Sequence, residues 1–339
     1  MDKYSVYIPS DRLQEMAGQL ALPDRCQGTA LFADISGFTP LTEALVRKFG
    51  PQRGAEELTR YLNQVYDSLI TCLDHFGGTV ISFAGDAITC WFDQDDGMRA
   101  AACALCMQAE MKQFADIRIS VTSTGPLASE QAVPLTVTLT VKVALATGPA
   151  RRFVVGDPNL LLIDVLAGTT LYQLASAEHQ AEKGEIILDF TTVKSLGDRA
   201  EISNWRIDQE NGEAFGVLRQ LQAIPYARPF PPLAEQTLPE EMLKSWVLPP
   251  VYQRLRQGQG EFLAELRPAI AMFVNFTGID FDSDPEAGEK LNRYVVWAQN
   301  VLARYDAYFF QLIVGDKGNY LYGGFGAPIA HEEIGRAHV

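Results

Sequence analysis

The sequence has a shortage of basic residues and no long apolar run. Its 28 lysines and arginines stand against 42 aspartates and glutamates, for a net charge of −14. That balance argues against binding nucleic acid or anionic lipid through a basic surface. No apolar run approaches the roughly 18 residues of a membrane-spanning helix, and residues 1–16 lack the apolar centre of a signal peptide. These absences predict a cytoplasmic protein with no membrane span and no nucleic-acid partner.

Cysteine and histidine are also scarce, with five and four residues. Cys103 and Cys106 form a C-x-x-C, but their surroundings, AAACALCMQAEM, read as a buried helix. No second Cys/His pair accompanies them, as a metal site would require. We therefore predict that both cysteines pack in the core and carry no metal or redox chemistry.

The pattern of apolar residues indicates a mixed α and β fold. TALFADI at 29–35 is typical of a buried strand, and 54–76 has apolar residues at helical spacing. TVISFA and AITCWF flank Gly85 and Asp86 as the strands of a hairpin would. Further along, 117–148 reads as β-rich, 168–182 as a helix and GEIILD as a strand.

A second stretch repeats the first. PAIAMFVNFTGID resembles TALFADISGFTPL, and GDKGNYLYGGFG resembles AGDAITCWF, which indicates a duplicated domain. The order β-α-α-β-β-α-β predicts a ferredoxin-like α+β sandwich. We expect an N-terminal extension over 1–27, a first domain over 28–205, a proline-rich linker over 206–266 and the first part of a second, similar domain over 267–332.

Two acidic residues lie where strands end. Asp34 closes LFAD, and Asp86 occupies the turn of the FAGDA hairpin. If the two strands are neighbours, both carboxylates point at one spot, an arrangement that suits a pair of Mg²⁺ or Mn²⁺ ions in phosphoryl transfer. Each aspartate taken alone is more simply explained as turn chemistry.

The segment after Asp34 is suited to hold phosphate. It consists of Ser36, Gly37, Phe38 and Thr39. Glycine permits a tight turn, and the free amides at the start of the next helix can bind a triphosphate.

F-A-D-I-S-G-F-T, followed about 45 residues later by F-A-G-D-A, resembles the catalytic domain of the class III adenylyl/guanylyl cyclases. VALATGPARRFVVGDPN and GEIILD are similar to later parts of that domain, so the resemblance covers about residues 28–200. It implies that Asp34 and Asp86, with the carbonyl of Ile35, bind two Mg²⁺ or Mn²⁺ ions. It also implies in-line attack of the ribose 3′-oxygen of ATP on the α-phosphate, with release of pyrophosphate.

Family sites form between two such domains, and the first half lacks the groups that a partner domain supplies. Tyr172 and Ser176 stand where the family has Asn-x-x-x-Arg, and Ser82 stands where a lysine often precedes F-A-G-D. A homodimer of this half would therefore lack anion-stabilising donors, each worth about 10²–10³ in rate.

The second half has the complementary pattern. Asn275 and Asn319 replace Asp34 and Asp86, and Lys317 lies in G-D-K-G. This resembles the second catalytic half of the tandem, bicarbonate-type soluble adenylyl cyclases, and implies intramolecular pairing of the halves with Lys317 contacting adenine. A solvated turn lysine is the alternative. Ser82 and the missing arginine in 157–182 predict no bicarbonate activation by that family's route.

Residues 333–339 correspond to the translation of a common short-read sequencing adapter, so we expect the second domain to be cut off near residue 332. Together these features predict an adenylate cyclase for intracellular signalling, almost inactive as this fragment. The alternatives are an inactive cyclase-like regulatory or nucleotide-binding module and a diguanylate cyclase. The absence of a G-G-D/E-E-F turn argues against the last.

Overall fold

The structure, a computed structural model, describes residues 3–122, 132–209, 211–234, 237–258, 269–315 and 318–328. Its main sheet has eight strands, seven of them in the order β2-β3-β1-β6-β8-β10-β9, with β7 paired to β6. Neighbouring strands are antiparallel except for the parallel pair β6 and β8. The strands are β1 (Arg25–Ser36), β2 (Thr79–Ala84), β3 (Ala87–Asp93), β6 (Thr140–Val155), β7 (Ile163–Ala167), β8 (Ile186–Asp189), β9 (Ala200–Ile207) and β10 (Ala214–Leu221).

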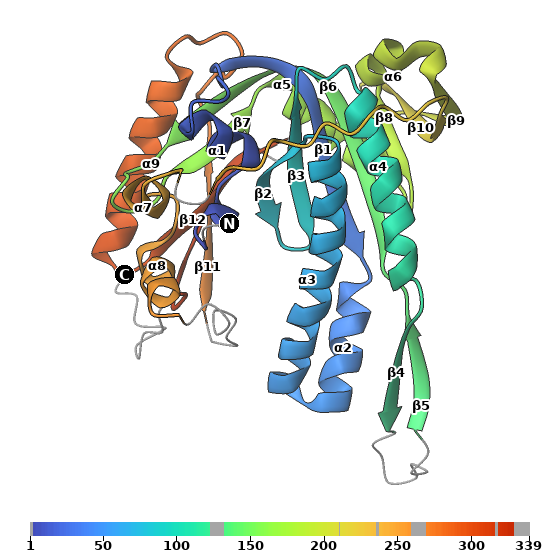
Figure 1. Ribbon diagram of the computed structural model, residues 1–339, viewed down its shortest axis with the longest axis horizontal. Helices are drawn as coiled ribbons and strands as arrows, with labels where there is room; N and C mark the ends of the chain where they lie inside the picture. The colour runs from blue at the N-terminus through green and yellow to red at the C-terminus, as the bar shows by residue number, and fades with distance from the viewer. Residues whose placement is uncertain are drawn as a thin grey trace.

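Strand β1 lies inside this sheet, between β3 and β6, and its two faces contact two different apolar cores. Side chains alternate between the faces of a strand, and Leu31, Ala33 and Ile35 are fully buried on one face. Helices α3 (Pro51–His75) and α4 (Met98–Glu110) cover that face (Figure 1). Ala30 and Phe32 lie on the other face, which α5 (Thr169–Gln180) covers.

Shorter elements connect and extend the sheet. Helix α2 (Phe38–Phe49) pairs with α3, and the hairpin of β4 (Ile117–Thr122) and β5 (Ala132–Val137) projects from one end of the molecule (Figure 1). The remaining short helices of the first half are η2 (Met111–Phe114), α6 (Phe190–Leu196) and η3 (Gly197–Arg199).

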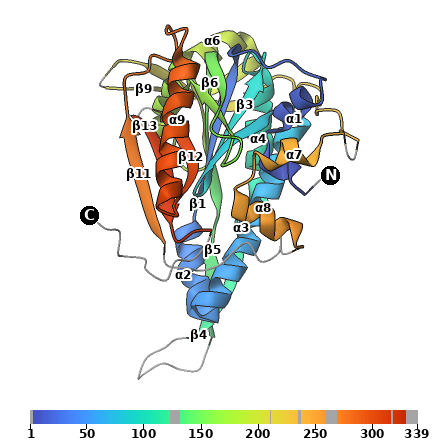
Figure 2. The ribbon, with the colours of Figure 1, turned by 90° about the vertical axis from the view of Figure 1, so that its left-hand side faces the viewer.

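A second, three-stranded sheet has the order β11-β13-β12. Its strands are β11 (Ile270–Phe276), β12 (Tyr308–Gly315) and β13 (Gly318–Phe325), and α9 (Ala287–Arg304) lies between the first two in sequence. Strand-helix-strand-strand with this pairing repeats the arrangement of β1, α3, β2 and β3. Figure 2 shows α9 beside these strands, with β11 at the outer edge. The helix packs against Phe153 and Val165 of the β6–β7 extension.

The segment expected to be a linker has two parts. Its beginning is not a linker in the structure, because β10 pairs with β8 and β9 pairs with β10 at the edge of the main sheet. Its later part forms α7 (Glu240–Lys244) and α8 (Pro249–Arg256). Trp246 and Tyr252 pack there against Tyr4 and Leu13 of the N-terminal segment, which contains η1 (Ser5–Tyr7) and α1 (Ser10–Met16).

The structure corrects the prediction for one cysteine. Cys103 is fully buried, as expected, but Cys106 forms a disulfide with Cys72 of α3. The prediction failed because the partner lies 34 residues away in sequence, whereas the C-x-x-C pattern directs attention to the nearest cysteine.

None of the helices in the described part of the chain combines the length and apolar character that crossing a bilayer requires.

Candidate functional site

The two aspartates singled out in the sequence lie at the same end of two neighbouring strands. Strands β1 and β3 are antiparallel, and Asp34 is paired with Ala87, the residue after Asp86. The backbone amide of Ile35 donates a hydrogen bond to the carbonyl oxygen of Asp86, with 3.2 Å between nitrogen and oxygen. Gly85 has φ +67°, which lets the hairpin turn tightly enough to place Asp86 beside β1.

A lysine that the sequence analysis did not single out reaches this site. Lys142 of β6 is directly paired with Asp34 on the other side of β1, and its Nζ lies 3.3 Å from Oδ2 of Asp34. The same ammonium forms an ion pair with Glu178 of α5. Three carboxylates and one ammonium leave the site with an excess of negative charge, which favours divalent cations.

Burial and charge act against each other at Asp34. Burial raises the pKa of Asp34, and the negative charge of Asp86 raises it further, whereas the ion pair with Lys142 lowers it; the net result is a raised pKa. Burial lowers the pKa of Lys142, but its bonds to Glu178 and Asp34 outweigh that effect and raise it overall. Lys142 therefore stays charged at neutral pH and helps to keep Asp34 ionised.

A tyrosine from helix α3 holds the hairpin turn. The hydroxyl of Tyr66 donates a hydrogen bond to the carbonyl oxygen of Gly85 at 2.9 Å. Its ring packs edge-on against Phe83, with 5.3 Å between ring centroids. Burial, together with the negative charges of Asp86 and Asp34, raises the pKa of Tyr66 to about 12. The hydroxyl thus remains a protonated donor beside both aspartates.

The turn after Asp34 is shaped by glycine. Gly37 has φ +110° and precedes the first residue of α2. A Cβ at this position would lie 2.4 Å from the carbonyl oxygen of Thr138, so no other residue fits without moving the backbone. Phe38 is buried in the main core, while Ser36 is half-buried and Thr39 is exposed. Phe38 can therefore offer a ligand its backbone amide, whereas its ring serves packing.

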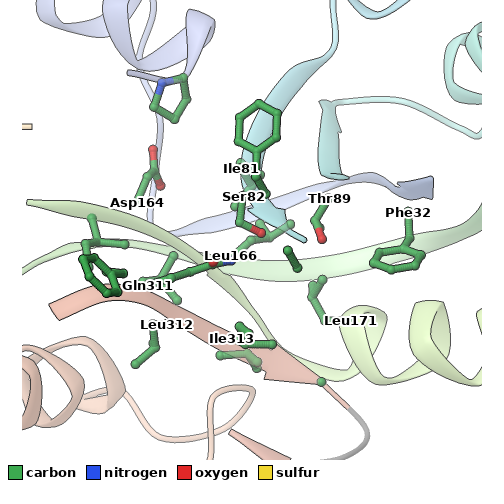
Figure 3. Close-up of a pocket in the computed structure, with 18 of the residues that line it drawn as sticks. Phe32, Ile81, Ser82, Thr89, Asp164, Leu166, Leu171, Gln311, Leu312 and Ile313 are labelled. Carbon is green, nitrogen blue, oxygen red and sulfur yellow. The ribbon is translucent and has the colours of Figure 1, made fainter. Parts of the chain in front are cut away.

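A cavity of about 520 Å³ lies between the two sheets, and Asp34, Asp86 and Lys142 are not among its described lining residues. Figure 3 shows side chains from strands of both sheets pointing into it. Ser82 and Thr89 come from β2 and β3, and Gln311 and Ile313 come from β12. Glu178 also lines the cavity and connects it to Lys142. Among the described lining residues there is no lysine or arginine.

The second sheet repeats the register of the first. Asn275 is paired with Tyr320, and Asn319 immediately precedes Tyr320, as Asp86 precedes the partner of Asp34. Asn319 is 7% exposed, and its Oδ1 has no hydrogen-bond partner among the described residues. Lys317, which we expected to contact the base, lies outside the described residues, as do 329–339.

The carboxylate pair fits a hard divalent cation. No group of three or more His, Cys, Asp or Glu residues arranged for a metal occurs in the described ranges, so a closed site of the zinc type has no candidate there. Mg²⁺ is usually held by one or two carboxylates together with substrate phosphates. Asp34 and Asp86, at adjoining strand ends with the Gly37 turn and the start of α2 beside them, are consistent with that arrangement.

Comparisons with known proteins give a consistent family. Residues 25–211 match the family described as the adenylate and guanylate cyclase catalytic domain. Adenylate cyclase type 10 of Homo sapiens is 25% identical over 342 residues, which cover 90% of this chain and 20% of that protein. An adenylate cyclase of Anabaena cylindrica is 27% identical over 124 residues, which cover 35% of this chain and 23% of that protein.

This chain therefore spans about a fifth of the length of the curated relatives that it matches. The crystal structure of the adenylyl cyclase CyaB from P. aeruginosa aligns with a TM-score of 0.45 at 19% identity, covering 59% of this chain and 97% of that one.

Proposed function

Because this chain belongs to the class III adenylyl/guanylyl cyclase family, we propose that it carries the metal-binding half of an adenylate cyclase that converts ATP to 3′,5′-cyclic AMP and pyrophosphate. The observation that carries the proposal is the pairing of Asp34 with Ala87, together with the hydrogen bond from Ile35 to Asp86. These two contacts bring the backbones of Asp34 and Asp86 together at one end of the sheet, which supports a metal site shared by their side chains.

Asp34, Asp86 and the carbonyl oxygen of Ile35 would hold two Mg²⁺ or Mn²⁺ ions. Such ions supply positive charge to the triphosphate and to the attacking ribose oxygen. The residues of the chain itself would position ATP so that its ribose oxygen attacks the α-phosphate in line. Backbone amides of Ser36 to Thr39 would bind phosphate oxygens, and Gly37 allows the backbone to approach them.

Lys142 has a distinct role in this proposal. Its ammonium already lies between Asp34 and Glu178. When divalent ions occupy the carboxylates, the ammonium is free to contact a phosphate oxygen while Glu178 keeps it near the site. Charge-assisted hydrogen bonds of this kind are stronger than neutral ones.

We further propose that 28–205 and 267–332 are two ferredoxin-like cyclase domains, the second of them partial. The shared order of β1, β3, β2 and β11, β13, β12 supports this. Asn275 and Asn319 would then be uncharged residues at the positions where the first domain has its metal-binding aspartates. Lys317 would contact adenine.

A non-catalytic module is the second candidate, because α5 carries Tyr172 and Ser176 where the family has Asn-x-x-x-Arg. In that case the cleft would bind a nucleotide or a partner without turnover. The retained pair of Asp34 and Asp86 favours the enzyme.

Bicarbonate activation is not expected. Ser82 lines the cavity between the sheets, and no lysine or arginine does so among the described residues. A bicarbonate ion in this cavity would then lie beside Glu178, with no lysine or arginine among the described lining residues to compensate its charge. A rate increase with bicarbonate at fixed pH that is lost in Ser82→Ala would contradict this.

The deciding experiment is turnover of Mn²⁺-ATP by the protein expressed from its natural gene. Asp34→Ala should abolish cyclic AMP formation, whereas Lys317→Ala should mainly lower the preference for ATP over GTP as substrate. The chain of 339 residues should be almost inactive by itself. Full activity of Asp34→Ala would refute its role as a metal ligand, and nucleotide binding without turnover by the native protein would favour the non-catalytic module.

A further inference from the structure

A disulfide connects the two long helices that cover one face of the main sheet. Cys72 of α3 is bonded to Cys106 of α4, and their Cα atoms are 5.9 Å apart, within the range that unstrained backbones allow. The bond closes a loop of 34 residues. That loop contains β2, the turn with Asp86, and β3.

The bond is accessible to small molecules. Cys72 and Cys106 both line an open groove of about 740 Å³ between the helices. Cys72 is buried, but Cys106 is half-buried. The remaining cysteines, Cys26, Cys90 and Cys103, form no disulfide, and the last two are fully buried in the core.

The groove has an acidic lining. Asp67 and Glu110 contribute carboxylates and His75 an imidazole, and no lysine or arginine occurs among the described residues that line it. Gln113 bridges the helices at this point, since its Nε2 donates to Ser68 Oγ and to Glu110 Oε2, each at 3.3 Å. Carboxylates disfavour anionic reagents and attract cationic ones, most strongly at low salt.

We propose that Cys72 and Cys106 form a reversible dithiol–disulfide site that exchanges with small neutral or cationic thiols and disulfides, and that its oxidation clamps α3 to α4. In the oxidation, the thiolate of the more exposed Cys106 attacks a small disulfide RSSR and releases one RS⁻. The thiolate of Cys72 then attacks the mixed disulfide at Cys106 and releases a second RS⁻. Both leaving groups take up the two cysteine protons, so one RSSR becomes two RSH and one protein disulfide forms.

Peptide mapping tests the site. The purified chain is reduced with dithiothreitol in its native state, exposed to cystamine, quenched in acid, alkylated under denaturing conditions and analysed by mass spectrometry. We expect one linked peptide pair, containing Cys72 and Cys106, that native dithiothreitol treatment opens again. Cys26→Ser, the control, should give the same pair, and Cys106→Ser should give none. A link through Cys103, no link, or a link that resists reduction in the folded protein would overturn the proposal.

Two further measurements test the reagent class and the clamp. Cystamine should oxidise the pair several-fold faster than glutathione disulfide at low salt, and the ratio should fall as salt rises. Equal rates would overturn the charge selection.

Oxidation should raise the melting temperature by about 5 °C or more and slow amide exchange in α3 and α4, with neither change in Cys106→Ser. Identical melting and exchange in the two redox states of the native sequence would overturn the clamp.

Discussion

The ammonium of Lys142 lies 3.3 Å from the carboxylate of Asp34, at the position of β6 that is directly paired with it. The same ammonium contacts Glu178 of α5, so a cation from the chain itself already occupies the edge of the proposed metal site. It lowers the pKa of Asp34 against the opposing effect of burial. The pairing therefore connects the strand register of the main sheet to the protonation of a proposed metal ligand.

Replacing Lys142 should change how Mn²⁺ binding depends on pH. Asp34 must be deprotonated to bind the ion, and its pKa is raised in the folded chain, so affinity should fall as the pH drops through that value. In Lys142→Ala the lowering contribution of the ammonium is gone, so the midpoint should move to higher pH. Electron paramagnetic resonance of free Mn²⁺ across the acid range measures it. Lys112→Ala is the control, and an unchanged or lower midpoint would contradict the ion pair's role.

Tyr66→Phe should weaken metal binding without unfolding the chain. The substitution keeps the ring against Phe83 and removes the hydrogen bond to Gly85. A net hydrogen bond is worth about 0.5–1.5 kcal/mol, so we expect the affinity for Mn²⁺ to fall by about 2–12-fold while the melting temperature changes little. Tyr61→Phe on the same helix is the matched control. If Tyr66→Phe binds Mn²⁺ as tightly as the native chain, the turn does not depend on this contact.

Arg152→Ala should be strongly destabilising. Its buried guanidinium bonds to the carboxylates of Asp11 and Asp164, at 2.8 Å to the nearer oxygen of Asp164. Removing it leaves two buried carboxylates short of a partner, which typically costs about 3–5 kcal/mol. Urea denaturation of native and variant chains measures the loss. Arg118→Ala breaks an exposed pair with Asp116 and should leave the midpoint unchanged; equal effects of the two variants would contradict this account.

Much of the local structure was predictable from apolar patterns. Strand β1 contains the predicted 29–35, and α3 begins three residues before the predicted start at 54. The hairpin around Gly85 and Asp86 was recognisable because a two-residue turn between alternating strands is a local signal. The turn at Gly37 was also recognisable from local sequence, because glycine before a helix start is a local signal. The structure adds the close carbonyl oxygen of Thr138.

The features that the sequence did not reveal depend on contacts between residues that are far apart in the chain. Lys142 comes to Asp34 because β6 pairs with β1, although a single charge inside VKVALATG was a usable hint. Tyr66 reaches Gly85 from a helix whose pattern showed only its apolar face. Residues 206–221 were included in the proline-rich linker, yet their backbone hydrogen bonds extend the sheet through β8. Such pairings are set by the assembled fold, so local propensity does not reveal them.

Binding of Mn²⁺ in the presence of a non-hydrolysable ATP analogue tests the central claim most directly. Native chain, Asp34→Asn, Asp86→Asn and the exposed control Asp116→Asn are titrated side by side. Joint ligation by Asp34 and Asp86 predicts that either substitution at the site abolishes nucleotide-dependent Mn²⁺ binding, while the control binds as the native chain does. Native-like binding by both Asp34→Asn and Asp86→Asn would contradict it.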